Sequence, residues 1–359
     1  MRLGGVEERA WRGGRGARAR RRIFGRRRRR FRRGFPMLLV LALVALAAAA
    51  QVTVVGRESA NSERPGGAAR AATGASRAPT GGLGGGGVGA ARVPGGLAGA
   101  AGGSVRVRLR RPPRAAVLAD LADGRELFAY RPLRQLPIAS LTKIASALVV
   151  VRSAPPDAVV RIPSAALHYS GSGIGLLRRG MRVRVETLLA GLLTVSGNDA
   201  AIALARTVAP SERVFVDRMN ALARELGLVC THFVDPHGLS PRDRSCARDL
   251  VILARAAMAE PRIRRIVGRR VATYPFPIRG GKLWLASHNP LLRSGYPGTI
   301  GLKTGYTEAA GRCLVAVVRR RGRTLVAVVL GSHDPARQAR ALLDAGFRQA
   351  RHKGRGSPL

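Results

Sequence analysis

The stretch Pro137-Ile138-Ala139-Ser140-Leu141-Thr142-Lys143-Ile144, followed by an apolar run to Val151, decides the fold. As the opening turn of a buried helix, it places Ser140 and Lys143 three residues apart on one face. Ser140 then lies near the helix N-terminus, where unpaired N–H groups and the positive dipole end favour a developing negative charge. Helix stability requires neither residue, so the pair predicts a hydroxyl beside an amine. The S-x-x-K spacing alone recurs by chance and needs further support.

Two further triplets supply that support. Ser196-Gly197-Asn198 lies in a loop predicted between two helices, and Lys303-Thr304-Gly305 lies in the strand-like segment 298–307. S-x-x-K with S-D-N and K-T-G is the motif set of class A β-lactamases and penicillin-binding proteins, and the three stretches of this chain occur in the order of that set. Flanking segments extend the match, namely Ser196–Ala201, Pro236–Leu239, Ala247–Leu250 and Gly301–Thr307. The region 112–351 resembles the secreted D-alanyl-D-alanine carboxypeptidases, which are low-molecular-mass penicillin-binding proteins.

The catalytic roles follow from the chemistry of the pair and from this resemblance. A serine hydroxyl is a poor nucleophile at neutral pH, and lysine serves as its base only if the amine is neutral part of the time. We expect Lys143 to be buried, with Lys303 across the cleft as a second cation that lowers its pKa. Ser140 is then the acyl-accepting nucleophile and Lys143 the proton acceptor. The resemblance implies that Ser196 relays a proton to the leaving amine.

The residues expected to bind substrate are Asn198, Lys303, Thr304, Gly305, Tyr306 and Arg337. A glycine within a strand is costly unless something approaches its backbone, as a substrate lying antiparallel along the Gly305 edge would. The resemblance implies that Asn198 hydrogen-bonds the peptide, and that the lysine, the threonine and the arginine hold its terminal carboxylate. The oxyanion would lie between the backbone N–H groups of Ser140 and Tyr306. No metal or other cofactor is expected.

Three alternatives remain open on the sequence. Asp235 and His237, in a compact Pro/Gly loop, could form a Ser-His-Asp triad with the nucleophile. A class A β-lactamase would need a glutamate that activates the deacylating water. The glutamates between the second and third motifs, none in a Glu-x-x-Leu-Asn setting, are Glu212, Glu225 and Glu260. A catalytically silent wall-binding module is the third alternative, which the intact motifs disfavour.

The preferred prediction is a serine-type D-Ala-D-Ala carboxypeptidase that acts on peptidoglycan stem peptides. β-Lactam antibiotics would then act as its covalent inhibitors. The fold that the resemblance implies is the α+β serine β-lactamase/transpeptidase-like fold. The residue patterns agree with it, because strands at both ends of the region enclose a block of helices, which predicts an antiparallel sheet built from both ends with a helical insert. The predicted strands are 115–121, 126–130, 159–162, 271–278, 300–306, 313–318 and 324–330; the predicted helices are 185–193, 200–208, 212–226, 246–258, 261–267 and 335–350.

The chain divides into five predicted segments. Residues 1–34 carry fifteen arginines and no apolar periodicity, which indicates a basic disordered segment left in the cytoplasm. Residues 35–56 form a signal peptide or a membrane anchor, and 57–104 are a Gly/Ala-rich flexible linker. The catalytic domain is placed at 105–350 and a basic tail at 351–359. The domain would therefore be exported, either anchored to the membrane through 35–56 or secreted after cleavage.

The formal net charge of +43 invites a nucleic-acid interpretation. The arginines are scattered, however, with few aromatics and no stacking or helix-turn-helix pattern, so no nucleic-acid partner is expected. Three cysteines form no C-x-x-C motif and predict no zinc site. Cys313, in an apolar strand pattern, should be a buried free thiol. Cys230 and Cys246 could pair as a disulfide, which only their separation in space can decide.

Overall fold

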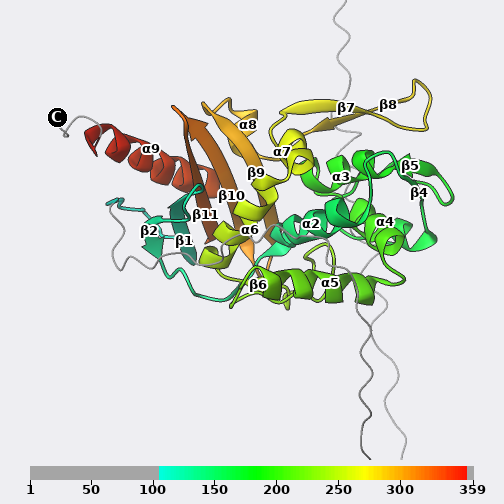
Figure 1. Cartoon of the computed structure of the whole chain (residues 1–359), viewed down its shortest axis with the longest axis horizontal. Helices are drawn as coiled ribbons and strands as arrows, with labels where there is room; N and C mark the ends of the chain where they lie inside the picture. The colour runs from blue at the N-terminus through cyan, green and yellow to red at the C-terminus, as the bar shows by residue number, and fades with distance from the viewer. Residues whose placement is uncertain (1–104, 354–359) are drawn as a thin grey trace, which may run out of the picture. The chain divides into compact units, whose positions relative to one another are not determined.

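The computed structural model describes residues 105–353 (Figure 1). The predicted segments 1–34, 35–56 and 57–104 lie outside the described residues. Within 105–353, every helix is too short or too polar to cross a bilayer. The last helix, α9 (Pro335–Lys353), runs three residues into the segment predicted as a basic tail.

A five-stranded antiparallel sheet forms the centre of the described region, in the order β2-β1-β11-β10-β9. Its strands are β1 (Ala115–Asp120), β2 (Glu126–Tyr130), β9 (Thr299–Thr307), β10 (Gly311–Arg320) and β11 (Arg323–Ser332). The first strand pairs with the last, with Ala115 opposite Leu330. The sheet is thus assembled from both ends of the domain, as predicted, and β2 and β9 are its two edge strands.

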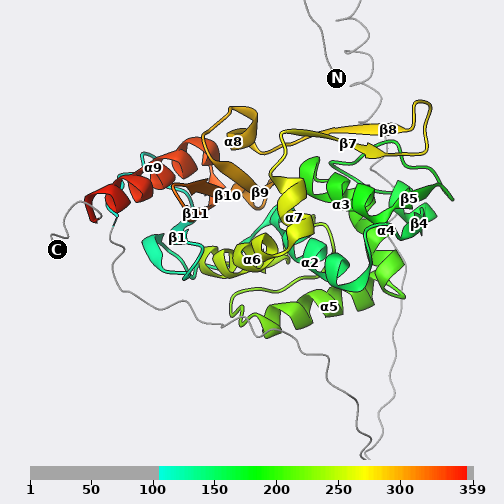
Figure 2. The same cartoon turned by 45° about the horizontal axis from the view of Figure 1, so that its top comes forward.

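Both faces of this sheet are covered, which explains why β1, β10 and β11 consist largely of consecutive apolar residues. Successive side chains point to opposite faces. Leu314 and Ala316 pack in one apolar cluster with Leu342 of α9, whereas Val315 and Val317 belong to the larger cluster on the other face. Figures 1 and 2 show α9 on one side of the sheet and α6 with α2 on the other.

The helices of the insert surround α2, whose residues from Lys143 to Val150 are all buried. The α-helices of this region are α2 (Lys143–Ser153), α3 (Val185–Thr194), α4 (Asn198–Val208), α5 (Glu212–Glu225), α6 (Ala247–Ala259) and α7 (Pro261–Val267). Helices α3, α4, α5, α6 and α7 all contact α2. The Ser140–Lys143 motif therefore enters a helix at the centre of the insert, and the predicted α+β fold is confirmed.

Several short elements were not expected from the sequence. They are β3 (Leu136–Pro137), the 3₁₀ turn η3 (Ser164–Leu167), β5 (Arg182–Arg184), β6 (Arg244–Ser245), β8 (Lys282–Ala286) and α8 (Pro290–Arg293). The predicted strand 271–278 ends early, as β7 (Val271–Pro275), and turns back to pair with β8. The predicted strand 159–162 is β4 (Val159–Arg161), which pairs with β5.

The opening turn of the helix that carries Lys143 differs from the prediction. Residues Ala139–Thr142 form a 3₁₀ turn, η2, and the α-helix begins only at Lys143. Ala139 has a φ of 50°, a left-handed conformation that costs a non-glycine residue of order 1–3 kcal/mol. The tighter turn still keeps Ser140 and Lys143 on one side, because residues three apart are aligned in a 3₁₀ helix.

Candidate active site

The side-chain amine of Lys143 is the centre of the site. This lysine is fully buried, and its Nζ lies 2.9 Å from Ser140 Oγ, 2.6 Å from Asn198 Oδ1 and 2.6 Å from the carbonyl oxygen of His237. A protonated amine donates to all three. A neutral amine has two N–H groups and one lone pair, and neither the amide oxygen nor the carbonyl can donate a proton. The lone pair is therefore left for the hydroxyl of Ser140.

The charge state of this lysine is set by its surroundings. Burial lowers the pKa of Lys143 well below its ordinary value, and the nearby cation Lys303 lowers it further. The carboxylates of Asp235, Asp243 and Asp199 act in the opposite direction but do not outweigh burial. The expected burial of Lys143 and the lowering of its pKa by Lys303 are confirmed, and its role as base stays a prediction. A lysine with a lowered pKa can accept the hydroxyl proton of a neighbouring serine.

A second lysine–serine pair lies across the site. Lys303, on the edge strand β9, donates to Ser196 Oγ at 2.9 Å and to the carbonyl oxygen of Thr304 at 2.9 Å. Burial lowers the pKa of Lys303 to about 7. Ser196 lies between α3 and α4 with a φ of 63°, a strained conformation of the kind that gathers at functional sites. The three sequence motifs thus meet in one place.

Gly305 has a different neighbour from the one expected. A Cβ at this position would lie 3.0 Å from the carbonyl oxygen of Ile138, 3.1 Å from Ser140 N and 3.2 Å from Ala139 Cβ. These distances are shorter than ordinary van der Waals contact. Strand β9 packs directly on the η2 turn, so the close approach of the turn that carries Ser140 is one reason for a glycine here, beside the expected approach of a substrate.

The loop containing Asp235 and His237 contacts the site through its backbone. The ring of His237 faces Asp235, with 2.9 Å between Nδ1 and Oδ1, while its carbonyl oxygen accepts from Lys143. The other ring contact recorded among residues 105–353 is a long hydrogen bond from Leu239 N. This geometry favours the lysine as base over a Ser-His-Asp triad.

Comparison with known proteins agrees with this geometry. Residues 110–334 match the D-alanyl-D-alanine carboxypeptidase family of peptidases. The chain belongs to this family. Among curated family members, DacF of Bacillus subtilis is 34% identical over 253 residues, which are 67% of this chain and 64% of the relative. DacB2 of Mycobacterium tuberculosis is 36% identical over 245 residues, covering 66% of this chain and 82% of the relative.

Solved structures of similar proteins agree with this family assignment. A D-alanyl-D-alanine carboxypeptidase from Mycobacterium tuberculosis superposes with a TM-score of 0.63 at 34% identity, covering 69% of this chain and 95% of that one. A variant of a Streptomyces DD-transpeptidase gives a TM-score of 0.63 at 30% identity, covering 67% and 100%. The chain spans less than two thirds of the length of some curated family members, including DacF and, at 62%, DacD of Escherichia coli.

The remaining substrate-binding predictions are placed as follows. Asn198 is buried, with its amide group bonded to Lys143 and, through Nδ2, to the carbonyl of Ser170 at 2.6 Å. Tyr306 is 64% exposed on β9. Arg337 is exposed in the first turn of α9, where its backbone N–H donates to Asp334. The substrate roles of all three residues stay predictions.

Some contributors to the site were missed in the sequence. Asp199, directly after the second motif, accepts from the backbone N–H groups of Ile174 and Gly175, each at 3.0 Å, and so fixes the loop above Asn198. An aspartate at the start of a predicted helix is a pattern from which a structural role of this carboxylate could have been predicted. The carbonyl of His237 had none, since a backbone oxygen is common to every residue type.

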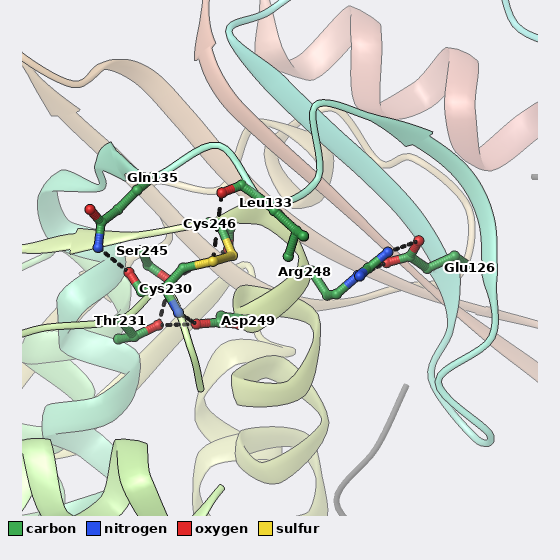
Figure 3. Close-up of a disulfide and its surroundings, with 9 residues drawn as sticks. All are labelled: Glu126, Leu133, Gln135, Cys230, Thr231, Ser245, Cys246, Arg248 and Asp249. Atoms are coloured by element: carbon green, nitrogen blue, oxygen red, sulfur yellow. Dashed lines mark hydrogen bonds and ion pairs between the residues drawn. A yellow bond between two sulfur atoms is a disulfide. The ribbon is translucent and has the colours of Figure 1, made fainter. Parts of the chain in front are cut away.

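The three cysteines behave as the sequence allowed. Cys230 and Cys246 form a disulfide with a Cα separation of 5.5 Å (Figure 3). Cys313 is a buried free thiol. Burial raises the pKa of Cys313 to about 11, so this thiol is unreactive at neutral pH. Asp249 lies close enough to Cys230 and Cys246 for the three to hold a metal ion, but the disulfide removes both thiolates.

Proposed function

We propose that this protein is a serine-type D-Ala-D-Ala carboxypeptidase, which removes the terminal D-alanine of peptidoglycan stem peptides through an acyl-enzyme on Ser140. The observation that carries the proposal is the environment of Lys143. Two of its three close neighbours accept hydrogen bonds but cannot donate them, so the lone pair of the neutral amine is left for the Ser140 hydroxyl. Family membership supplies the substrate class.

In the proposed acylation step, Lys143 accepts the hydroxyl proton as Ser140 Oγ bonds to the carbonyl carbon of the penultimate D-alanine. The backbone N–H groups of Ser140 and Tyr306 would stabilise the oxyanion. The C–N bond to the terminal D-alanine then breaks. Lys143 gives up the proton that it accepted, and Ser196 relays this proton to the leaving nitrogen. The Lys303 amine, 2.9 Å from Ser196 Oγ, orients the Ser196 hydroxyl and attracts the substrate carboxylate.

In deacylation, water enters the space vacated by D-alanine. Lys143 accepts a proton from this water as its oxygen bonds to the ester carbon, and the proton returns to Ser140 Oγ when the ester bond breaks. The product is the shortened peptide with a new terminal carboxylate. The same base serves both half-reactions, so no additional general base is needed.

The β-lactamase alternative receives little support from the glutamates. Glu212 is 2.9 Å from Arg206 and Glu225 is 2.9 Å from Arg152, both in ion pairs near the surface. Glu260 lies at the C-terminal end of α6. With the first two glutamates held in ion pairs, the described residues give no sign of an additional base for the deacylating water. The amine that a penicillin releases on ring opening stays attached to the acyl group and occupies the space that D-alanine would vacate, so we expect a penicillin acyl-enzyme to hydrolyse slowly.

We also propose that the domain acts outside the cytoplasm, since its substrate belongs to the cell wall. The predicted division at residues 34, 56 and 104, with export through 35–56, is part of this proposal. Fractionation of cells that produce the full chain tests it: activity should be found outside the cytoplasm, and activity confined to the cytosol would contradict it.

D-Alanine release is the first test of the proposed activity. A peptide ending in D-Ala-D-Ala should lose one D-alanine per molecule, and Ser140→Ala should release it at least about 10⁴-fold more slowly, because the nucleophile is missing. Coupled D-alanine detection measures this directly. Equal release by Ser140→Ala at an unchanged melting temperature would contradict the proposal.

The pH profile of acylation gives a second test. Acylation requires neutral Lys143, so its rate rises as pH increases through the pKa of this amine. Because burial and Lys303 lower that pKa, the rise should occur at a lower pH than for an ordinary lysine. Lys303→Met removes a cation, which raises the pKa of Lys143, and the rise should then move to higher pH.

The measurement is the rate of labelling by a fluorescent penicillin between about pH 5 and pH 10. The exposed Lys282 provides a matched control, and Lys282→Met should leave the profile unchanged. Lys303→Met is expected to lower the rate at every pH, so only the position of the rise is diagnostic. A rise that stays in place or moves to lower pH would refute the proposed coupling between the two lysines.

A further inference from the structure

The Cys230–Cys246 disulfide closes a loop whose two ends are 16 residues apart in the sequence. Cys246 directly follows β6 and precedes α6, and it is fully buried. The loop has no element longer than two residues, so its conformation depends on its end points and on the contacts that it makes. Those contacts lead to both partners of the Ser140–Lys143 pair.

The first connection runs to Ser140. Strand β6, next to Cys246, pairs with β3, with Leu136 opposite Ser245, and the Ile138 N–H donates to the carbonyl of Asp243 at 3.2 Å. Gln135 also donates to the carbonyl of Cys230 at 2.9 Å (Figure 3). Residues 135–138 are therefore held to both ends of the disulfide loop, and the next residues form the η2 turn that presents the nucleophile.

The second connection runs to Lys143 through the middle of the loop. The carbonyl of Pro236 accepts from Ser146 Oγ at 2.6 Å, and that of His237 accepts from Lys143 at 2.6 Å. Gly238 lies so close to the η2 turn that a Cβ on it would be 2.1 Å from the carbonyl oxygen of Ala139. The loop thus contacts α2 and η2 together.

We infer that the Cys230–Cys246 disulfide is a positioning element for the Ser140–Lys143 pair, acting through the segment before Ser140 and the loop that carries the His237 carbonyl. This inference rests on the proposed acyl-enzyme chemistry. Opening the bond lets both segments shift relative to α2. The amine loses one of its two fixed acceptors, and its lone pair is no longer confined to the Ser140 hydroxyl.

Other contacts hold the same region and indicate what remains when the bond is opened. His232 and Arg244 form a backbone bridge, and Asp249 Oδ2 accepts from Cys230 N and Thr231 Oγ1, each at 2.7 Å (Figure 3). These bonds join the two ends of the loop to each other and to α6, close to the disulfide. The domain should therefore stay folded without the disulfide, while the active-site end of the loop gains freedom.

The test compares oxidised protein with protein reduced by a small dithiol, which opens the disulfide to two thiols as the reagent itself becomes a cyclic disulfide. The readout is the second-order rate of labelling by a fluorescent penicillin, at a temperature where circular dichroism shows both forms folded. We expect reduction to lower this rate about tenfold, since small displacements of catalytic groups have effects of this order or larger. Reoxidation should restore it.

Two variants separate positioning from stability. Cys230→Ala/Cys246→Ala should label as slowly as the reduced protein and be insensitive to the dithiol. Leu343→Ala, on α9 at the opposite face of the sheet, removes a fully buried side chain and lowers the melting temperature, but should label at the normal rate while folded. If the double cysteine variant does not fold, the dithiol titration of the wild-type protein still decides.

The outcome that overturns the inference is a reduced, folded protein that labels at the oxidised rate while only its melting temperature falls. Failure of the proposed function has a different result: the oxidised wild-type protein would show no Ser140-dependent label at all. Mass spectrometry after thiol alkylation verifies the redox state in each sample, and a mass shift at both Cys230 and Cys246 identifies the opened bond.

Discussion

Replacing Lys143 by methionine should slow acylation of Ser140 by penicillin about 10²- to 10⁴-fold, the usual range for loss of a positioned general base. Methionine fills similar space but cannot accept a proton. It also leaves Asn198 Oδ1 and the His237 carbonyl without their buried donor, at a cost to stability of about 1–3 kcal/mol for each unsatisfied group. Stopped-flow labelling with a fluorescent penicillin measures the rate.

The matched comparison is His237→Ala. It removes the imidazole and its contact with Asp235 but keeps the carbonyl that faces Lys143, so labelling should stay within a fewfold of the wild-type rate. A folded His237→Ala variant that no longer labels, beside a Lys143→Met variant that does, would exchange the two roles and favour the Ser-His-Asp triad.

Gly238→Ala, which adds a single methyl group, should lower both the stability of the protein and its rate of labelling by penicillin. The residue has a φ of 84°, and a Cβ there would lie 2.1 Å from the carbonyl oxygen of Ala139 and 2.9 Å from Thr142 Oγ1. Strain and overpacking together should lower the free energy of unfolding by roughly 2–6 kcal/mol. Because relief requires η2 to move away from the loop, folded Gly238→Ala should also label much more slowly than the wild-type protein.

Gly280 supplies the control for this substitution. Its φ is 85°, almost the same, but nothing lies within 4 Å of a Cβ built on it. Gly280→Ala should therefore carry the backbone cost without the collision and should label normally. Urea unfolding and penicillin labelling of both variants give the two effects. Equal behaviour of the two variants would mean that contact between the loop and η2 does not matter.

The sequence predicted the site best where function depends on the type of side chain. Ser140, Lys143, Ser196 and Lys303 are specified by hydroxyl and amine chemistry at fixed spacing, and all four meet in the structure. The sheet was also predictable, because apolar runs such as that in β10 leave few other arrangements.

The features that were missed depend on the backbone and on tertiary contacts. The 3₁₀ turn at Ala139–Thr142 follows from its packing against β9 and the Gly238 loop, and neither neighbour is close in sequence. The close approach at Gly305 was predicted, but periodicity could not identify the neighbour. The hairpin formed by β7 and β8 is the exception, because a local signal was present: Gly280-Gly281 lies between the two strands, and Gly-Gly is a hairpin turn signal.

The most direct test of the central claim is mass spectrometry of the intact protein and of its tryptic peptides after mixing with penicillin, followed over time beside a D-alanine release assay. The account predicts one adduct, located on Ser140 and lost slowly, in a protein that turns over a D-Ala-D-Ala peptide. It also predicts that prior acylation blocks D-alanine release in proportion to the adduct. Rapid loss of the adduct without D-alanine release, or an adduct on another residue, would contradict the account.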